Sequence, residues 1–169
     1  EVLADVEDEH EDTDSWIIEG FPLLKQLPQV IFGSGSSGKR YLAMWLAGKL
    51  AEMDIPVLYA DWEFSQAEHK KRLSRMFAPM PKSLRYIRCE HSLKHETDHL
   101  LDVGQKNRIQ YIVCDSMGFA CEGPAEASEG AGGYYRALRQ LRSGSLNLAH
   151  TPKPGDDARE AQVFGSVFF

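Results

Sequence analysis

Short apolar segments recur along the chain, and more polar stretches separate them. These segments are QVIF (29–32), PVLYADWE (56–63), LRYIR (84–88), IQYIVCD (109–115) and SLNLAH (145–150). Most of them lack the strict polar alternation of a half-buried strand, and IQYIVCD is apolar over four consecutive residues. A strand that is covered on both faces is apolar at nearly every position. The pattern therefore predicts buried strands.

Helical spacing appears between the predicted strands. Ser65 and Glu68 form a capping-box pattern, which predicts a basic helix that ends near residue 77. Two further helices are expected, one from Ser92 to about residue 106 and one over 134–142. A helix over 38–53 is predicted from the spacing of Leu42, Trp45, Leu46, Leu50 and Met53.

The regular alternation of strand and helix predicts the fold class. We expect an α/β protein with a mainly parallel sheet, helices on both faces and right-handed crossovers, which is a three-layer arrangement. Ligands bind such sheets at the carboxyl ends of the strands. The terminal VFGSVFF (163–169) has the pattern of a further strand, so the fold is expected to be incomplete at its C-terminus.

Composition adds a division of the chain into two parts. Residues 1–14 carry eight acidic residues and no Lys or Arg, and we expect a disordered, solvated tail there. Of the 25 acidic residues, 17 then remain against 19 basic ones, so residues 15–169 form a nearly neutral core. Order is expected to begin near 15–24, with Trp16 and Ile17 packed on the body.

Two absences bear on the compartment. No apolar run is long enough to cross a bilayer, so no membrane is expected. The three cysteines show no CxxC spacing, which argues against a disulfide framework or a zinc knuckle. The sequence therefore predicts a cytoplasmic protein.

The segment GSGSSGK (33–39) fits the phosphate-loop pattern GxxxxGK, and it lies between a predicted strand and a predicted helix. Backbone N–H groups of such a loop, together with the helix N-terminus, surround phosphates, and the lysine contacts them. The alternative is a Gly/Ser linker before an unrelated helix. We expect ATP to be bound by Gly33, Ser34, Gly35, Ser36, Ser37, Gly38, Lys39, Arg40 and Tyr41.

Arg40 departs from this pattern. The residue after the lysine is ordinarily Ser or Thr, whose hydroxyl holds Mg²⁺. A guanidinium has no oxygen to offer a metal. Three alternatives stay open: the metal is held through water and Asp115, it binds weakly, or Arg40 contacts phosphate directly.

Carboxylates end two of the predicted strands. Asp115 follows the apolar segment of residues 111–114, as the carboxylate that binds Mg²⁺ does in phosphate-loop proteins. Glu63 ends an earlier strand and could activate the water that attacks the γ-phosphate. Asp61 competes with Glu63, because residues 61 and 63 face the same side of an extended strand. A solvated strand end is the plain alternative for Glu63.

Several other polar and aromatic residues indicate a function less specifically than these carboxylates do. His150 ends the last predicted strand and could sense the γ-phosphate, or it could be satisfied locally in a turn. Tyr134 and Tyr135 could stack on bases of single-stranded nucleic acid, or they could belong to the core. The basic run 69–75 is expected to be a solvated helix face. The same holds for the histidines four residues apart, which are His91, His95 and His99 near Cys89.

The motifs together resemble the RecA-like ATPases, and most closely the replicative-helicase ATPases typified by plasmid RepA. The resemblance is carried in the family's order by IFGSGSSGKRYLAMWLA, PVLYADWEFS, YIVCDSMGFACEG, YYRALRQLRSGSLNLAHTPK and FGSVFF. It implies that Lys39 binds phosphate, Asp115 handles Mg²⁺, Glu63 is the catalytic carboxylate and His150 is the sensor. It also implies that strand 145–149 lies between the glycine-loop strand and the Asp115 strand.

The same resemblance implies a function. Family members assemble as rings or filaments with ATP between subunits, and a neighbouring subunit supplies a basic finger, for which 1–169 shows no matching residue. We therefore expect an oligomeric ATPase of DNA replication or recombination, of helicase or recombinase type, on single-stranded DNA. The alternative is a nucleotide-binding assembly protein with a degenerate loop and little or no hydrolysis. A small-molecule phosphotransferase is a weaker alternative, because no acceptor-site lid is evident.

Overall fold

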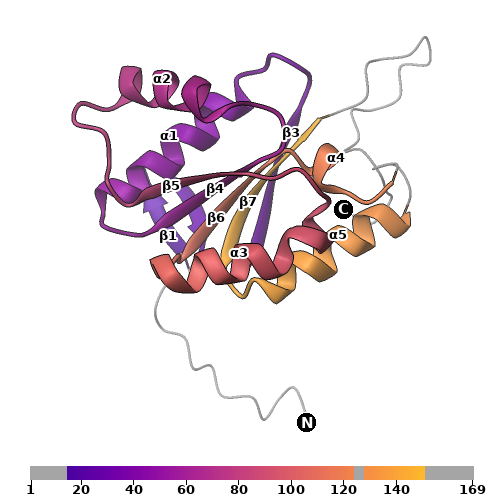
Figure 1. Ribbon diagram of the computed structural model, residues 1–169. Coiled ribbons are helices and arrows are strands. Elements are labelled where there is room, and N and C mark those ends of the chain that lie inside the picture. Colours follow the sequence, from indigo (N-terminus) through magenta and orange to yellow (C-terminus); the bar gives the residue numbers. More distant parts are fainter. Residues whose placement is uncertain (1–14, 124–127, 151–169) are drawn as a thin grey trace, which may run out of the picture.

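The computed structural model describes residues 15–123 and 128–150, which form an α/β fold (Figure 1). Its main sheet has five parallel strands in the order β3–β7–β6–β4–β5. The order confirms that the strand near 145–149 lies between the glycine-loop strand and the Asp115 strand. The strands are Pro28–Gly33 (β3), Val57–Asp61 (β4), Leu84–Arg88 (β5), Tyr111–Asp115 (β6) and Gly144–His150 (β7).

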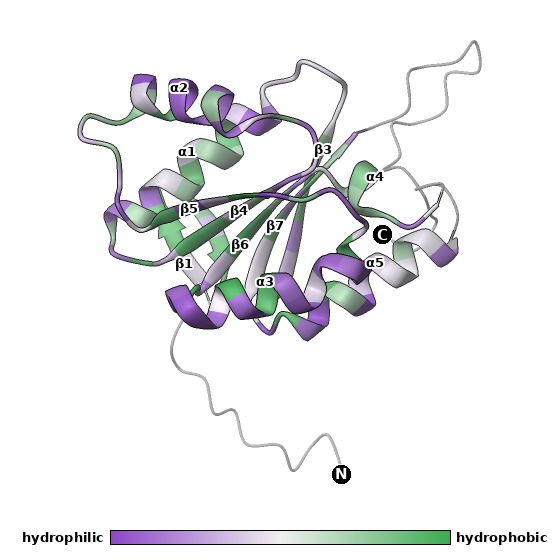
Figure 2. Cartoon of the chain, in the orientation of Figure 1, coloured by the Kyte–Doolittle hydropathy of each residue, from purple (hydrophilic) through white to green (hydrophobic). Residues whose placement is uncertain are grey.

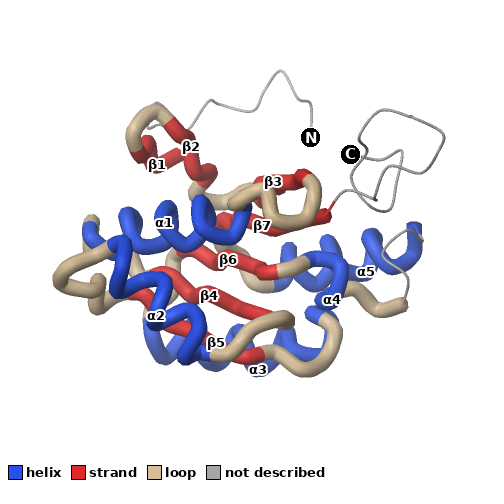
Figure 3. The backbone as a smooth tube through the Cα atoms, turned by 90° about the horizontal axis from the view of Figure 1, so that it is seen from above, coloured by secondary structure: helices blue, strands red, loops and turns tan. Residues whose placement is uncertain are grey.

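Helices cover both faces of this sheet, as expected from the alternating pattern. Helices α1 (Lys39–Glu52) and α2 (Gln66–Met76) lie on one face, and α3 (Leu93–Asn107) and α5 (Ser128–Gln140) lie on the other (Figure 1). Seen from above, the strands follow one another in the order given, with α1 and α2 in front of them (Figure 3). The described residues therefore form three layers.

The two faces of the sheet bury different residues of the same strands. In β4 and β6, Leu58 and Ile112 belong to the apolar cluster under α3 and α5, whereas Val57 and Tyr111 belong to the cluster under α1. Successive side chains of a strand point to opposite faces, so a strand between two helical layers needs apolar residues throughout. The apolar interior and the polar outer faces of the helices are visible in Figure 2.

The region after β6 differs from the expected loop. A short helix, α4 (Met117–Ala120), follows β6, and α5 begins at Ser128 rather than at residue 134. The glycines near 130–133 made this stretch resemble a loop. Ala131, Tyr134 and Leu138 are buried on one face of α5, and tertiary packing overrides the low helix propensity of glycine.

An antiparallel hairpin that the apolar pattern did not predict precedes the sheet, formed by β1 (Ser15–Ile18) and β2 (Phe21–Leu24). Trp16 packs edge-on against Tyr111, with ring centroids 5.7 Å apart, as expected. The expectation for Ile17 was wrong, because its side chain is 57% exposed. Ile18 is buried instead, since neighbouring residues of a strand face opposite sides.

Several expectations fall on residues outside the described ranges. They are the acidic tail at 1–14, the loop 151–164 and the further strand at 163–169. Within residues 15–123 and 128–150, none of the helices has the length and apolar character that a bilayer span requires.

Candidate nucleotide site

The glycine loop links β3 to α1 at the carboxyl edge of the sheet. Gly38 caps the helix N-terminus with φ 84°, a left-handed conformation that glycine adopts without a Cβ penalty. The Lys39 amine donates to the carbonyl oxygens of Gly33 and Ser34, both at 2.7 Å, and to Ser37 Oγ at 3.3 Å. In this arrangement the Lys39 amine binds the same loop that would surround a phosphate.

The parallel register brings four predicted strand ends to one edge. Gly33 pairs with His150 across β3 and β7, and Asp61 pairs with Asp115 across β4 and β6. A cavity of about 260 Å³ opens beside these ends. It is lined by Ser36, Ser37, Gly38, Lys39, Arg40, Tyr41, Asp115, Leu148 and His150. Of the nine residues expected to bind nucleotide, those from 36 to 41 line it, and Gly33, Ser34 and Gly35 do not.

Arg40 binds both of the carboxylates that the sequence singled out. Its Nε and Nη2 donate to the two oxygens of Asp115, the latter at 3.0 Å, and Nη2 also donates to Glu63 Oε2 at 2.6 Å. The guanidinium lies 4.1 Å from the ring centroid of Phe64. Burial lowers the pKa of Arg40, but the hydrogen bonds and charges of Asp115 and Glu63 outweigh burial and raise that pKa above its usual value.

Glu63 is fixed from two sides. Its Oε1 accepts from Ser116 Oγ at 2.7 Å and lies 3.5 Å from His150 Nε2, while Oε2 accepts from Arg40. Burial raises the pKa of the Glu63 carboxyl, but the bonds from Ser116 and Arg40 hold that pKa below its usual range. A carboxylate stabilised in this way is a weak base for activating water.

Asp61 has a different environment from Glu63. Strand β4 ends at Asp61, so the side-chain alternation of a continuous strand does not extend to residue 63. The Asp61 side chain is fully buried. It accepts from the backbone N–H groups of Glu63 and Phe64 at 3.0 and 2.8 Å, and from Tyr86 at 3.2 Å. These bonds hold the turn that follows β4, so Asp61 supports the position of Glu63.

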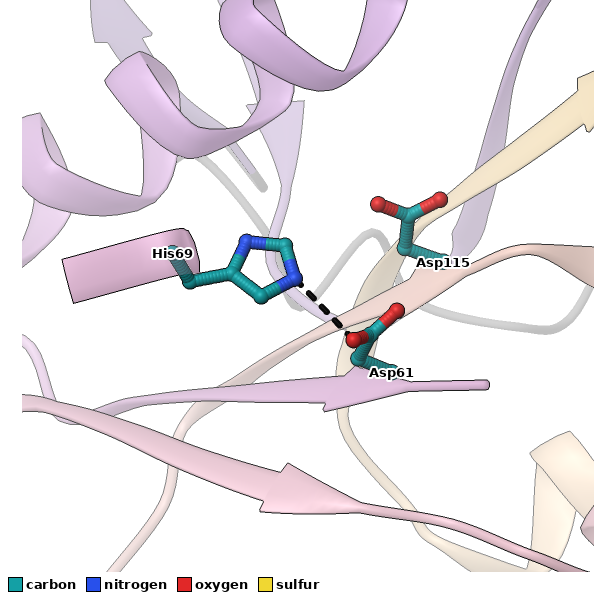
Figure 4. Close-up of side chains that lie close together, drawn as sticks. All are labelled: Asp61, His69 and Asp115. Atoms are coloured by element: carbon teal, nitrogen blue, oxygen red, sulfur yellow. Dashed lines mark hydrogen bonds and ion pairs between the residues drawn. The ribbon is translucent and has the colours of Figure 1, made fainter. Parts of the chain in front are cut away.

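Within the described ranges, one group of side chains has the composition and spacing of a metal site. Asp61, His69 and Asp115 offer ligand atoms that all lie within 4.8 Å of one another. Figure 4 shows the His69 ring directed at Asp61, with Asp115 on the neighbouring strand. These side chains already have partners within the protein. His69 Nε2 lies 3.0 Å from Asp61 Oδ2, and Tyr59 donates to Asp115 at 2.8 Å.

The arrangement around Asp115 does not suit Mg²⁺. A magnesium ion takes oxygen ligands in octahedral geometry. Arg40 offers no oxygen, and its guanidinium occupies both oxygens of Asp115 and one of Glu63. The expectation that Asp115 handles Mg²⁺ stays a prediction, and a metal there must first displace Arg40.

Sequence reasoning missed four residues of this site. Tyr59 lies two residues before the end of β4, Ser116 directly follows β6, and Phe64 follows Glu63. His69 was assigned to a solvated basic run, yet it is buried. A signal was available, because His69, Leu73 and Met76 recur at helical spacing and mark the inward face of α2.

Other sequence candidates are placed elsewhere. Tyr134 is buried, and its hydroxyl donates to Asn147 Oδ1 at 2.6 Å, so this ring belongs to the core and not to a stacking surface. His95 is exposed and lies 3.0 Å from the hydroxyl of Ser92. His91 and His99 form no candidate metal group within residues 15–123 and 128–150.

No protein-family model matches this chain. A search of curated proteins likewise finds no match. The resemblance to RecA-like ATPases therefore stays a prediction, and the fold established here is a five-stranded parallel α/β sheet with helices on both faces.

Proposed function

We propose that this chain binds the phosphates of ATP in its glycine loop and acts as a RecA-like ATPase of DNA replication or recombination. One observation supports this more than any other. The loop with Lys39 faces the strand ends that carry Asp115 and His150 across a single cavity, and Glu63 joins them through Arg40. Groups that can donate hydrogen bonds to phosphate and groups that carry carboxylates thus lie together at the carboxyl edge of the sheet, where parallel α/β sheets bind ligands.

The residues divide into roles on this proposal. Loop N–H groups and Lys39 bind the phosphates, since a helix N-terminus favours anions. Glu63 orients the attacking water, and His150, 3.5 Å from Glu63, senses the γ-phosphate. Copies of the chain assemble as a ring or filament on single-stranded DNA, as helicases or recombinases do.

A second candidate is favoured by the state of Glu63 and Arg40. The ion pairs of Arg40 occupy the carboxylates, and they lower the pKa of Glu63, which weakens it as a base. These features suit a nucleotide-binding assembly protein that hydrolyses ATP very slowly or not at all. In this candidate the bound nucleotide holds subunits together without turnover.

Two measurements test the candidates, and the second of them separates the two. The first is ATP affinity by calorimetric titration, which both candidates require. The second is the steady-state rate of phosphate release with and without single-stranded DNA. Stimulation by DNA supports the motor, whereas ATP-dependent assembly on a sizing column without turnover supports the assembly protein. Absence of ATP binding would overturn both.

A further inference from the structure

We infer that Arg40 serves as a built-in cation, so that the loop binds nucleoside triphosphates without a divalent metal. This inference rests on the proposed nucleotide site and concerns how that site balances charge. Triphosphates are strongly anionic, and phosphate-loop proteins commonly place Mg²⁺ between the phosphate oxygens and a strand-end carboxylate. Here a guanidinium is bound to that carboxylate.

The contacts of Arg40 cover the atoms that a metal would need. Its Nε and Nη2 bind both oxygens of Asp115, and Nη2 also binds Glu63. Tyr59 donates to Asp115 from another side. A divalent ion at Asp115 would have to break a two-point ion pair, and the Arg40 charge would also repel it.

Arg40 still has donors to offer a ligand. A guanidinium has five N–H groups, and Nη1 carries two of them. No hydrogen bond joins Nη1 to another residue within 15–123 or 128–150, while Arg40 lines the cavity beside the loop. Nη1 can therefore donate a charge-assisted hydrogen bond to a phosphate oxygen, while Nε and Nη2 stay on the two carboxylates.

The guanidinium is also held in place before any ligand arrives. The Phe64 ring lies 4.1 Å below it, and two carboxylates fix its edge. A donor that is already oriented loses little conformational entropy on binding. Lys39, which lines the same cavity, adds a second positive charge. Together these groups supply the charge that a metal would otherwise bring.

The test is a pair of calorimetric titrations of ATP into the full chain, one in excess EDTA and one in excess MgCl₂. We expect the parent to bind in both buffers with dissociation constants within about threefold of each other. Arg40→Thr should bind at least about tenfold more weakly than the parent in EDTA, because it loses a charge-assisted phosphate contact. Magnesium should restore much of that loss in the variant.

A matched control is Arg72→Thr. Arg72 lies over the same Phe64 ring at 5.0 Å, but its hydrogen bond goes to Glu68 and to neither site carboxylate. This variant should bind ATP like the parent in both buffers. A weakening in Arg72→Thr equal to that in Arg40→Thr would contradict a specific role of Arg40.

The parent alone can overturn the inference, whatever the stability of the variants. Binding that needs MgCl₂ and disappears in EDTA would show that Arg40 moves aside for a metal, and it would leave the proposed nucleotide site intact. Binding in neither buffer would overturn the nucleotide site as well.

Discussion

Arg40 Nη2 lies 3.0 Å from Asp115 Oδ1, across 75 residues of sequence. The pair joins the first turn of α1 to the carboxyl end of β6. Breaking such a pair leaves a charge that is poorly solvated, which costs more than the pair itself contributes. The free site is therefore stabilised in a form in which Arg40 is bound to both oxygens of Asp115.

Lys39→Ala is expected to weaken ATP binding by an order of magnitude or more, because a charge-assisted phosphate contact is worth about 1.5–3 kcal/mol. Calorimetric titration measures the change. Lys49→Ala is the control, since Lys49 lies on the same helix and pairs with Glu52. Equal affinities for Lys39→Ala and the parent would contradict the assignment of the loop.

Arg40→Thr is expected to raise the ATPase rate about tenfold or more and to introduce a sharp Mg²⁺ requirement. The threonine hydroxyl supplies an oxygen ligand, and Asp115 and Glu63 are released from the guanidinium. Positioning errors near 1 Å can cost about a hundredfold in rate, so restored positioning has a large effect. Rate measured against MgCl₂ concentration tests this. A parent that turns over as fast as the variant would show that Arg40 is no handicap.

Glu63→Gln is expected to abolish turnover while ATP stays bound, because the loop is unchanged and only the carboxylate that orients water is lost. Asp61→Asn, measured per folded molecule, should keep more activity, since Asp61 bonds to the turn and not to the cavity. Phosphate release and titration of each variant provide the comparison. Normal turnover by Glu63→Gln together with an inactive Asp61→Asn would reverse the roles.

Asp61 is expected to contribute stability that depends on pH. Burial raises the pKa of Asp61, but the bonds from His69 and from the backbone of Glu63 and Phe64 outweigh burial and hold it below the ordinary 3.8. The contribution is therefore complete above pH 3.8 and is lost as pH falls below it. Asp61→Asn should lower the unfolding free energy by about 2–4 kcal/mol near neutral pH.

Urea unfolding of both proteins between pH 7 and pH 3 measures this dependence. The difference between parent and Asp61→Asn should narrow only at the acid end of the range. A difference that stays constant to pH 3 would show that the loss comes from packing and not from the carboxylate charge.

Gly144→Ala is expected to destabilise the protein by about 1–3 kcal/mol, because inserting volume against fixed backbone forces it to shift. A Cβ at this position would lie 2.1 Å from the carbonyl oxygen of Leu24, where the hairpin meets β7. Gly104→Ala on α3 is the control, since its Cβ would meet nothing within 4 Å. That change should stabilise the helix by about 0.5–1 kcal/mol. Thermal unfolding of the two variants gives the comparison.

Much of the scaffold could be predicted from the sequence alone. The strand over 84–88 matches β5, and Ser65 caps the basic helix as predicted, since its Oγ accepts from the Glu68 N–H at 3.4 Å. Such features follow from local chemistry and from the period of apolar residues. The hairpin at Ser15–Leu24 was not predicted, because its two strands are only four residues long and depend on long-range partners. One of these is Tyr111, whose ring packs edge-on against Trp16.

At the site, the sequence determined which chemical groups are present and at which strand ends they lie. The sequence alone was enough to identify the GSGSSGK loop, Glu63, Asp115 and His150. It also showed that position 40 has no hydroxyl. Sequence left three alternatives for Arg40 open. Only the tertiary structure decided its partners in the free protein, because the register of β6 beside β4 and the start of α1 bring residues 75 positions apart into contact. An ion pair depends on distance and burial, and neither is encoded in the local pattern.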